Sequence, residues 1–293
     1  MNQVNRRQFI LRSLAGAGTF LTGLDRSTIA GEITASTKRS ASDQVMLGKT
    51  GIRLSRLAMG SGTNGSNHSS DQVRLGIKTF SDLLCYACDQ GVNFWESADQ
   101  YGSHDHLCAG MRRVGRDKVV ILTKTHARTA DQMRADLDRF RKELGTDYVD
   151  VVLLHCMMNS NWPQERRGAM DVLSGAREKG IIRAHGVSCH TLEALREAAS
   201  NPWVQVDLAR INPIQAHMDG DPATVISVLK EMKKAGKGVI GMKILGQGQL
   251  VHDVNRAIKH AVQLDCLDAF TIGFTSRTQL DEVTSKMPAL SIA

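Results

Sequence analysis

The stretch Gly91-Val-Asn-Phe-Trp-Glu-Ser-Ala-Asp-Gln-Tyr-Gly102 predicts a short apolar strand, residues 92–95, that runs into a polar loop. The loop carries Glu96 and, five residues later, Tyr101. Two later apolar runs end in the same way, one in Lys124 and the other in His155. Ionisable side chains at the carboxyl ends of parallel strands form the active sites of eight-stranded barrels. The pattern therefore predicts a site at one rim of a parallel barrel.

The rest of the chain repeats this strand-and-helix unit. A turn-rich segment around Gly48 and Gly51 predicts a hairpin ahead of the barrel. Strands are expected at 57–59, 92–95, 119–123, 149–154, 184–189, 206–211, 238–245 and 269–273. Helical patterns lie between them at 72–90, 105–113, 130–144, 165–179, 191–199, 222–235 and 253–263. The fold class expected is α/β, a single-domain (β/α)8 TIM barrel over residues 45–293.

The motifs resemble those of the aldo-keto reductases, over roughly residues 45 to 285. The family signature is Gly-Val-Asn-Phe-x-Asp-Thr-Ala-x-x-Tyr-Gly, and its catalytic tetrad of Asp, Tyr, Lys and His matches Glu96, Tyr101, Lys124 and His155. Glu in place of Asp is a departure. The resemblance implies an NAD(P)-dependent oxidoreductase that interconverts an alcohol and a carbonyl group in an aldehyde, ketone or sugar.

The resemblance also gives each residue of the tetrad a role. Tyr101 is the expected proton donor, and His155 would orient the substrate carbonyl. Lys124 is expected to lower the pKa of the phenol, which is about 10 in an unperturbed side chain. Glu96 would pair with Lys124 and hold it in place.

The cofactor expected from the resemblance is NADP, with NAD left open. Its binding residues, by the same resemblance, are Gly60, Ser61, Ser188, Cys189, Met242, Leu245, Gly246, Thr275, Ser276, Arg277 and Glu282. Cys189 and Met242 stand where the family has Asn and an aromatic residue. These replacements keep a second hypothesis open, an exported binding barrel without catalysis or without cofactor.

The amino terminus has the layout of a twin-arginine export signal. Arg6 and Arg7 precede a weakly apolar run, and small residues at 28–30 offer a cleavage site. A basic amphipathic helix or a disordered tail remains the alternative. Residues 1–30 are expected to be the signal and 31–44 a linker, which makes the export machinery a partner and the periplasm or exterior the location. The apolar run is too short for a membrane span.

Composition limits the other functions. The net charge is +7, and removing four Arg and one Asp of the first thirty residues leaves +4, so a nucleic-acid partner is not expected. Cys85 and Cys88 form an isolated Cys-x-x-Cys pair, which favours buried structural thiols over a redox pair. His104 and His106 are expected on a loop surface, and no metal site is expected.

Overall fold

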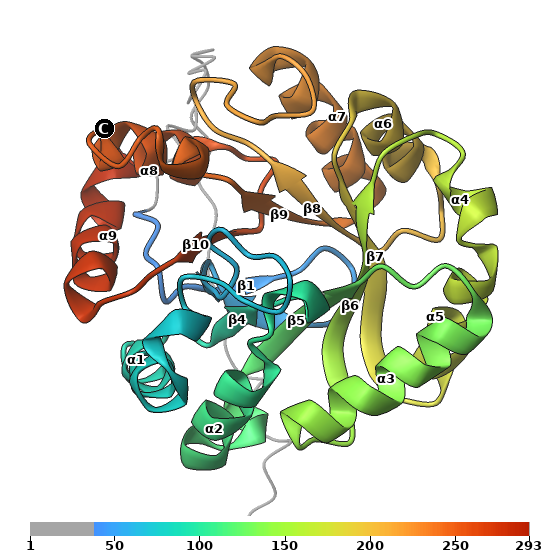
Figure 1. Ribbon diagram of the computed structural model, residues 1–293. Helices are drawn as coiled ribbons and strands as arrows, with labels where there is room; N and C mark the ends of the chain where they lie inside the picture. The colour runs from blue at the N-terminus through green and yellow to red at the C-terminus, as the bar shows by residue number, and fades with distance from the viewer. Residues whose placement is uncertain (1–37, 293) are drawn as a thin grey trace, which may run out of the picture. The chain divides into compact units, whose positions relative to one another are not determined.

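A closed barrel of eight parallel strands forms the centre of the computed structural model, which describes residues 38–292 (Figure 1). The neighbours around the barrel run in the order β10-β3-β4-β5-β6-β7-β8-β9. The strands are β3 (Leu57–Gly60), β4 (Phe94–Glu96), β5 (Val120–Thr125), β6 (Val149–Met157), β7 (Ile182–Cys189), β8 (Val206–Arg210), β9 (Gly238–Met242) and β10 (Ala269–Gly273). The predicted eightfold barrel is confirmed.

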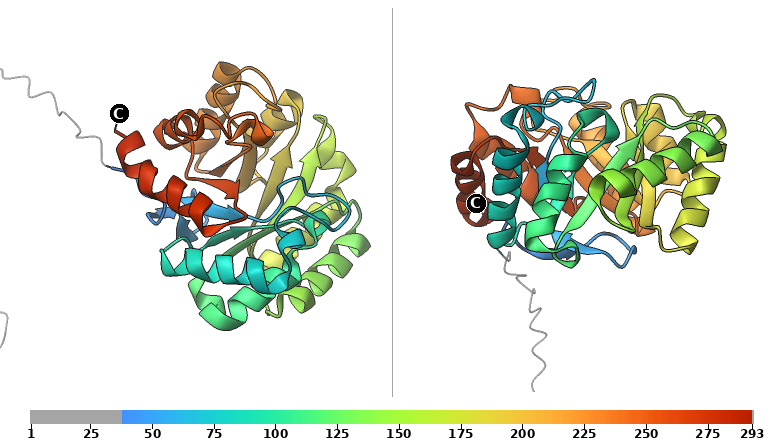
Figure 2. Two further views of the ribbon diagram at one scale, coloured as in Figure 1. Left: turned by 60° about the vertical axis from the view of Figure 1, so that its left-hand side comes forward. Right: turned by 60° about the horizontal axis from the view of Figure 1, so that its bottom comes forward.

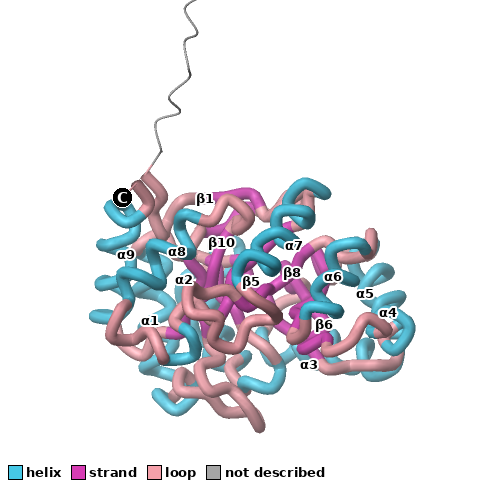
Figure 3. Tube along the Cα trace, turned by 90° about the horizontal axis from the view of Figure 1, so that it is seen from above, coloured by secondary structure: helices cyan, strands magenta, loops and turns pink. Residues whose placement is uncertain are grey.

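Helices surround the strands (Figure 3). They are α1 (Ile77–Asp89), α2 (His104–Val114), α3 (Ala130–Leu144), α4 (Trp162–Glu165), α5 (Arg167–Glu178), α6 (Leu192–Ser200), α7 (Pro222–Ala235), α8 (Val254–Gln263) and α9 (Arg277–Leu290). Short 3-10 turns are η1 (Val73–Leu75), η2 (Asp99–Tyr101), η3 (Arg116–Lys118) and η4 (Gly246–Gly248). Local signals set several helix ends: Thr129 and Gln132 form a reciprocal capping box on α3, and Asp221 caps α7 ahead of Pro222.

An antiparallel hairpin, β1 (Gln44–Met46) and β2 (Arg53–Ser55), lies at one end of the barrel (Figure 2, right). Leu47, Ile52 and Leu54 from this hairpin are fully buried and join the apolar cluster that fills the barrel interior. Gly48 has a φ of +50°, and a Cβ there would lie 2.3 Å from the backbone nitrogen of Gly238. The hairpin therefore closes the end opposite the carboxyl ends of the strands.

The predicted signal peptide, residues 1–30, lies outside the described residues, as does most of the predicted linker. The part of that linker that the structure describes contacts the barrel. Arg39 donates a hydrogen bond from Nη1 to the carbonyl of Val262 at 2.6 Å, and Ala41 is buried. The expected loop-surface position of His104 and His106 is wrong, because both are buried in α2, with the His104 ring between Glu143 and Thr123. Between residues 38 and 292, no helix has the length and apolarity needed to cross a bilayer.

Candidate active site

The four predicted catalytic residues come together at the rim where the barrel strands end. Glu96 is the last residue of β4, Lys124 lies near the end of β5, and His155 lies near the end of β6. Tyr101 closes the turn η2 that follows β4. Because all strands of the barrel are parallel, these ends share one rim, as the sequence predicted.

Lys124 is fully buried, and two oxygen atoms hold its ammonium group. Its Nζ pairs with Glu96 Oε1 and donates to the carbonyl of Ser97 at 2.7 Å. The second carboxylate oxygen of Glu96 accepts a hydrogen bond from Thr271 Oγ1 at 3.2 Å. The longer Glu side chain therefore keeps the ion pair and reaches Thr271 on β10 as well. Sequence reasoning gave Thr271 no part in this arrangement.

The Tyr101 ring is in contact range of two other members of the tetrad, Lys124 and His155. Lys124 Nζ lies 4.8 Å from the ring centroid, and the His155 ring stands edge-on at a centroid distance of 5.9 Å. Two glycines of the loop after β3 lie against opposite edges of the Tyr101 ring. A Cβ on Gly62 would lie 2.1 Å from Tyr101 Cε2, and a Cβ on Gly65 would lie 2.4 Å from Cδ1. Only glycine fits at either position, so this loop fixes where the phenol points.

The protonation states of Tyr101 and His155 follow from their pKa values, and the shift at Tyr101 differs from the expectation. Desolvation, followed by the negative charge of Glu96, raises the pKa of Tyr101 well above its ordinary value. The predicted net lowering of this pKa by Lys124 is therefore wrong, because desolvation of the phenol outweighs the attraction of the lysine for the phenolate. Desolvation, followed by the charge of Lys124, lowers the pKa of His155 well below its ordinary value. The site thus presents a protonated phenol and a neutral imidazole.

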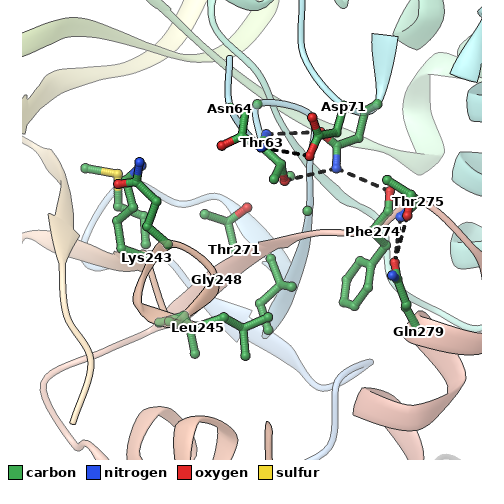
Figure 4. Close-up of a pocket in the computed structure, with 18 of the residues that line it drawn as sticks. Thr63, Asn64, Asp71, Lys243, Leu245, Gly248, Thr271, Phe274, Thr275 and Gln279 are labelled. Atoms are coloured by element: carbon green, nitrogen blue, oxygen red, sulfur yellow. Dashed lines mark hydrogen bonds between the residues drawn. The ribbon is translucent and has the colours of Figure 1, made fainter. Parts of the chain in front are cut away.

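A cavity of about 530 Å³ opens beside this tetrad (Figure 4). Glu96 and Tyr101 line it, whereas Lys124 and His155 are not among its lining residues. From there it follows the ends of β9 and β10 to the start of α9. Further lining residues on this path include Thr63, Asn64, Asp71, Lys243, Gln247, Gly248, Phe274 and Gln279. Its volume lies within the range of small-molecule and cofactor sites.

The loop after β9 forms one wall of the cavity with an unusual backbone. Lys243, Gly246, Gln247 and Gly248 all have positive φ angles, of 60°, 57°, 55° and 96°. A Cβ on Gly248 would meet nothing within 4 Å, so the main chain can approach a ligand there. Desolvation lowers the pKa of Lys243, which has no ion-pair partner among residues 38–292. These features fit a phosphate-bearing cofactor.

Of the predicted cofactor residues, five line the cavity: Gly60, Met242, Leu245, Thr275 and Glu282. Three others have different partners. The hydroxyl of Ser61 donates to the carbonyl of Glu96 at 2.9 Å, and the hydroxyl of Ser188 accepts from the backbone of Cys156 at 3.1 Å. Cys189 is fully buried, and its thiol lies beside Asp207.

The remaining three also lie outside the lining set. Gly246 is buried in the turn η4, where it packs on Ile214. Ser276 caps α9 by accepting from the backbone of Gln279 at 3.3 Å. The guanidinium of Arg277 lies 4.5 Å from the centroid of the Tyr86 ring, and its side chain is exposed at the start of α9. The role of each in cofactor binding stays a prediction.

One further cluster lies next to the tetrad. A ring nitrogen of His126, a ring nitrogen of His155 and the sulfur of Cys156 lie within 4.8 Å of one another. This set of atoms has the chemistry of a transition-metal site, which the sequence did not predict. The signal in the sequence was weak, because His155 and Cys156 are adjacent and would face opposite sides of a regular strand.

The family model described as "Aldo/keto reductase family" matches residues 56–283. The chain belongs to the aldo/keto reductase family. A protein described as an aldo-keto reductase from Pseudomonas aeruginosa shares the fold with a TM-score of 0.72 at 22% identity, over 88% of this chain and 99% of that one. The expected family is thus confirmed.

Among curated relatives of this family member, aldo-keto reductase AKR2E4 of Bombyx mori is 26% identical over 180 residues, 55% of either protein. L-galactose dehydrogenase of Arabidopsis thaliana is 24% identical over 216 residues, 70% of this chain and 66% of the relative. This chain therefore spans about half to two thirds of these curated relatives. Family membership supports the predicted oxidoreductase class over a non-catalytic barrel.

Proposed function

We propose that this aldo-keto reductase uses NADP(H) to interconvert a small carbonyl compound and its alcohol, with Tyr101 as the proton donor. The observation that carries the proposal is the Tyr101 ring, which faces the cavity and contacts Lys124 and His155. Two relatives support the cofactor: the Bombyx mori protein was solved with NADP, and one from Schizosaccharomyces pombe is named for NADP(+).

The cavity offers separate surfaces for the parts of a dinucleotide. Met242 and Thr271 line the same cavity as Tyr101 and would hold the nicotinamide end. The loop from Lys243 to Gly248 would hold the phosphates by close backbone approach and a lysine cation. Thr275, Gln279 and Glu282 would take the adenosine end. When bound, the dinucleotide supplies the hydride that no side chain can supply.

The chain's own residues then handle the substrate and the proton. The Tyr101 hydroxyl donates its proton to the carbonyl oxygen, and its raised pKa keeps that proton in place until the oxygen gains charge. His155 is neutral, so it holds the carbonyl oxygen by a hydrogen bond without adding a charge. Lys124, fixed by Glu96, stabilises the phenolate that remains.

The test is the Tyr101→Phe variant. We expect carbonyl reduction to fall by at least about 100-fold, because one general acid contributes 10²–10⁴-fold. NADPH binding, followed by fluorescence titration, should stay within about twofold of the starting protein. Tyr148→Phe is the matched control, because Tyr148 stacks under Arg116 at 4.0 Å, away from the cavity. Full turnover in Tyr101→Phe would remove Tyr101 from the mechanism. Failure of the starting protein to bind either dinucleotide would leave a cofactor-free binding barrel.

We also propose that the protein is exported by the twin-arginine route. The support is the sequence around Arg6 and Arg7, which lies outside the described residues. In cells with this pathway, the double variant Arg6→Lys/Arg7→Lys should leave the full-length protein inside, while Arg12→Lys should be exported and processed. Equal export of both variants would contradict this route. Nicotinamide dinucleotide released on denaturing the exported protein would show that the cofactor travels with it.

A further inference from the structure

Two histidines and a cysteine converge at the barrel rim, where the His155 ring stands edge-on to Tyr101. His126 follows β5 directly, whereas His155 and Cys156 belong to β6. One ligand atom from each lies within 4.8 Å of the other two. The two imidazole rings stack at a centroid distance of 4.7 Å with an interplanar angle of 23°. Two imidazoles bound to one tetrahedral ion have centroids about 5 Å apart, so the rings already have a suitable separation.

The backbone has departed from a regular strand to make this convergence possible. Successive side chains of a strand face opposite sides, so Cys156 should face away from His155. Instead, Cys156 has a φ of +60°, and the register of β6 with β7 shifts between Leu154 and Met157. A non-glycine residue rarely adopts this conformation, and such strain gathers at functional sites. The irregularity brings the thiol to the same side as the His155 ring.

The polar groups around the cluster leave ligand atoms available. His155 is 3% exposed, and its Nδ1 has no hydrogen-bond partner within residues 38–292. His126 Nε2 lies 2.9 Å from Gln100 Oε1, which fixes that ring through one nitrogen as outer partners of metal-binding histidines do. His190 Nε2 lies 3.5 Å from Cys156 Sγ, within reach as a fourth donor.

We propose that His126, His155 and Cys156 bind a divalent transition-metal ion of the zinc class, and that the bound ion blocks carbonyl reduction. Nitrogen and sulfur donors in this combination suit Zn²⁺, and the donor atoms around a tetrahedral ion lie about 3.5 Å apart, so the three side chains close by about 1 Å on binding. The Cys156 thiol loses one proton to solvent as the sulfur–metal bond forms. The blocking effect rests on the proposed function, because the ion would take His155 away from the substrate carbonyl.

Charges nearby set the strength of the site. Lys124 and Lys243 are close enough to act on both His155 and Cys156, Arg210 acts on Cys156 as well, and all three oppose a dication. Glu96 and the Cys156 thiolate offset part of that opposition. We therefore expect a dissociation constant of about micromolar, weaker than that of a structural zinc finger.

Cobalt titration of the full-length protein tests the site without any enzyme assay. Co²⁺ should produce a thiolate-to-metal charge-transfer band in the difference spectrum, with release of about one proton per ion.

Cys156→Ser should abolish the band and weaken binding by at least about 100-fold, because loss of even an outer partner costs 10- to 100-fold. His126→Gln, at an exposed position, should weaken it comparably, and Gln100→Leu by about tenfold. Cys88→Ser, which alters a half-buried thiol on α1, should change nothing. A missing band, or one that survives Cys156→Ser, would overturn the site.

Zinc inhibition tests the second half of the proposal. In protein that reduces a carbonyl substrate, Zn²⁺ should inhibit competitively with that substrate at the concentration that fills the site. Cys156→Ser should raise the inhibition constant by the same factor as the cobalt dissociation constant. Full activity at saturating Zn²⁺ would overturn the blocking role. If no substrate is turned over at all, the proposed function fails while the cobalt result still decides the metal site.

Discussion

Substitution of Gly62 by Ala tests whether the loop after β3 positions the proton donor. Gly62 has no positive φ, so alanine causes no backbone strain there. The new Cβ would lie 2.1 Å from Tyr101 Cε2, 2.4 Å from Cζ and 2.5 Å from Cδ2. The substitution therefore acts on the Tyr101 ring directly, without touching any ionisable group.

The size of the effect follows from these distances. Carbon atoms in contact lie about 3.5–4.0 Å apart, so the ring or the loop must move by more than about 1 Å. A misplacement of about 1 Å in an active site costs about 100-fold in rate. The same overlap should destabilise the fold by about 1–3 kcal/mol, as overpacking of a core does. We therefore expect kcat/KM for carbonyl reduction to fall about 100-fold in a protein that remains folded.

The assay compares kcat/KM with thermal unfolding in three variants. Gly175→Ala is the matched control, because Gly175 lies in α5 with nothing within 4 Å of an added Cβ and should become slightly more stable at full activity. In a Tyr101→Phe background, Gly62→Ala should cost little further activity, because the donor is already gone. Unchanged kcat/KM in folded Gly62→Ala would refute the positioning role.

Three further outcomes follow from the geometry. Thr271→Val removes one hydrogen bond to Glu96 and should lower kcat about tenfold, since hydrogen bonds to charged groups contribute about 1.5–3 kcal/mol; an unchanged kcat would contradict this. Lys243→Met should raise the dissociation constant of NADPH at least about tenfold and reduce its salt dependence, as measured by fluorescence titration. Burial raises the pKa of Asp207 to about 8, above its unfolded value of 3.8, so its contribution to stability is full below pH 3.8 and is lost as pH rises towards about 8. Asp207→Asn should flatten that decline in urea unfolding, and a decline that persists would place its origin elsewhere.

Most of the barrel could be predicted because its signals are local. Apolar runs mark the strands, and Glu96, Lys124 and His155 stand at their ends within the same short segments. The helix α9 was not predicted, because its sequence has a weak apolar periodicity and contains Pro288. Helix and strand positions thus followed from periodicity wherever the periodicity was strong.

The finer parts of the site depend on contacts that no local pattern encodes. Gly62 and Gly65 act through the edges of Tyr101, some forty residues away in the sequence. Ser61 matches a family position, but its hydroxyl is bound by the carbonyl of Glu96 and lies outside the cavity lining. The direction of the pKa shift of Tyr101 could not be predicted, because it depends mainly on how deeply the folded chain buries the phenol.

The replacement of Asp by Glu in the tetrad is best understood across three neighbouring strands. Glu96 on β4 pairs in register with Gly60 on β3, and Gly60 in turn lies beside Thr271 and Gly273 of β10. A Cβ on Gly60 would lie 2.7 Å from Thr271 Oγ1, so any side chain there would occupy the path between Glu96 and Thr271. The absence of that side chain lets the longer carboxylate cross β3 and bond Thr271 while it holds Lys124. An aspartate at this position would be one methylene shorter, whereas Glu96 reaches both partners, so Glu96, Gly60 and Thr271 act as one unit that keeps the buried lysine in place.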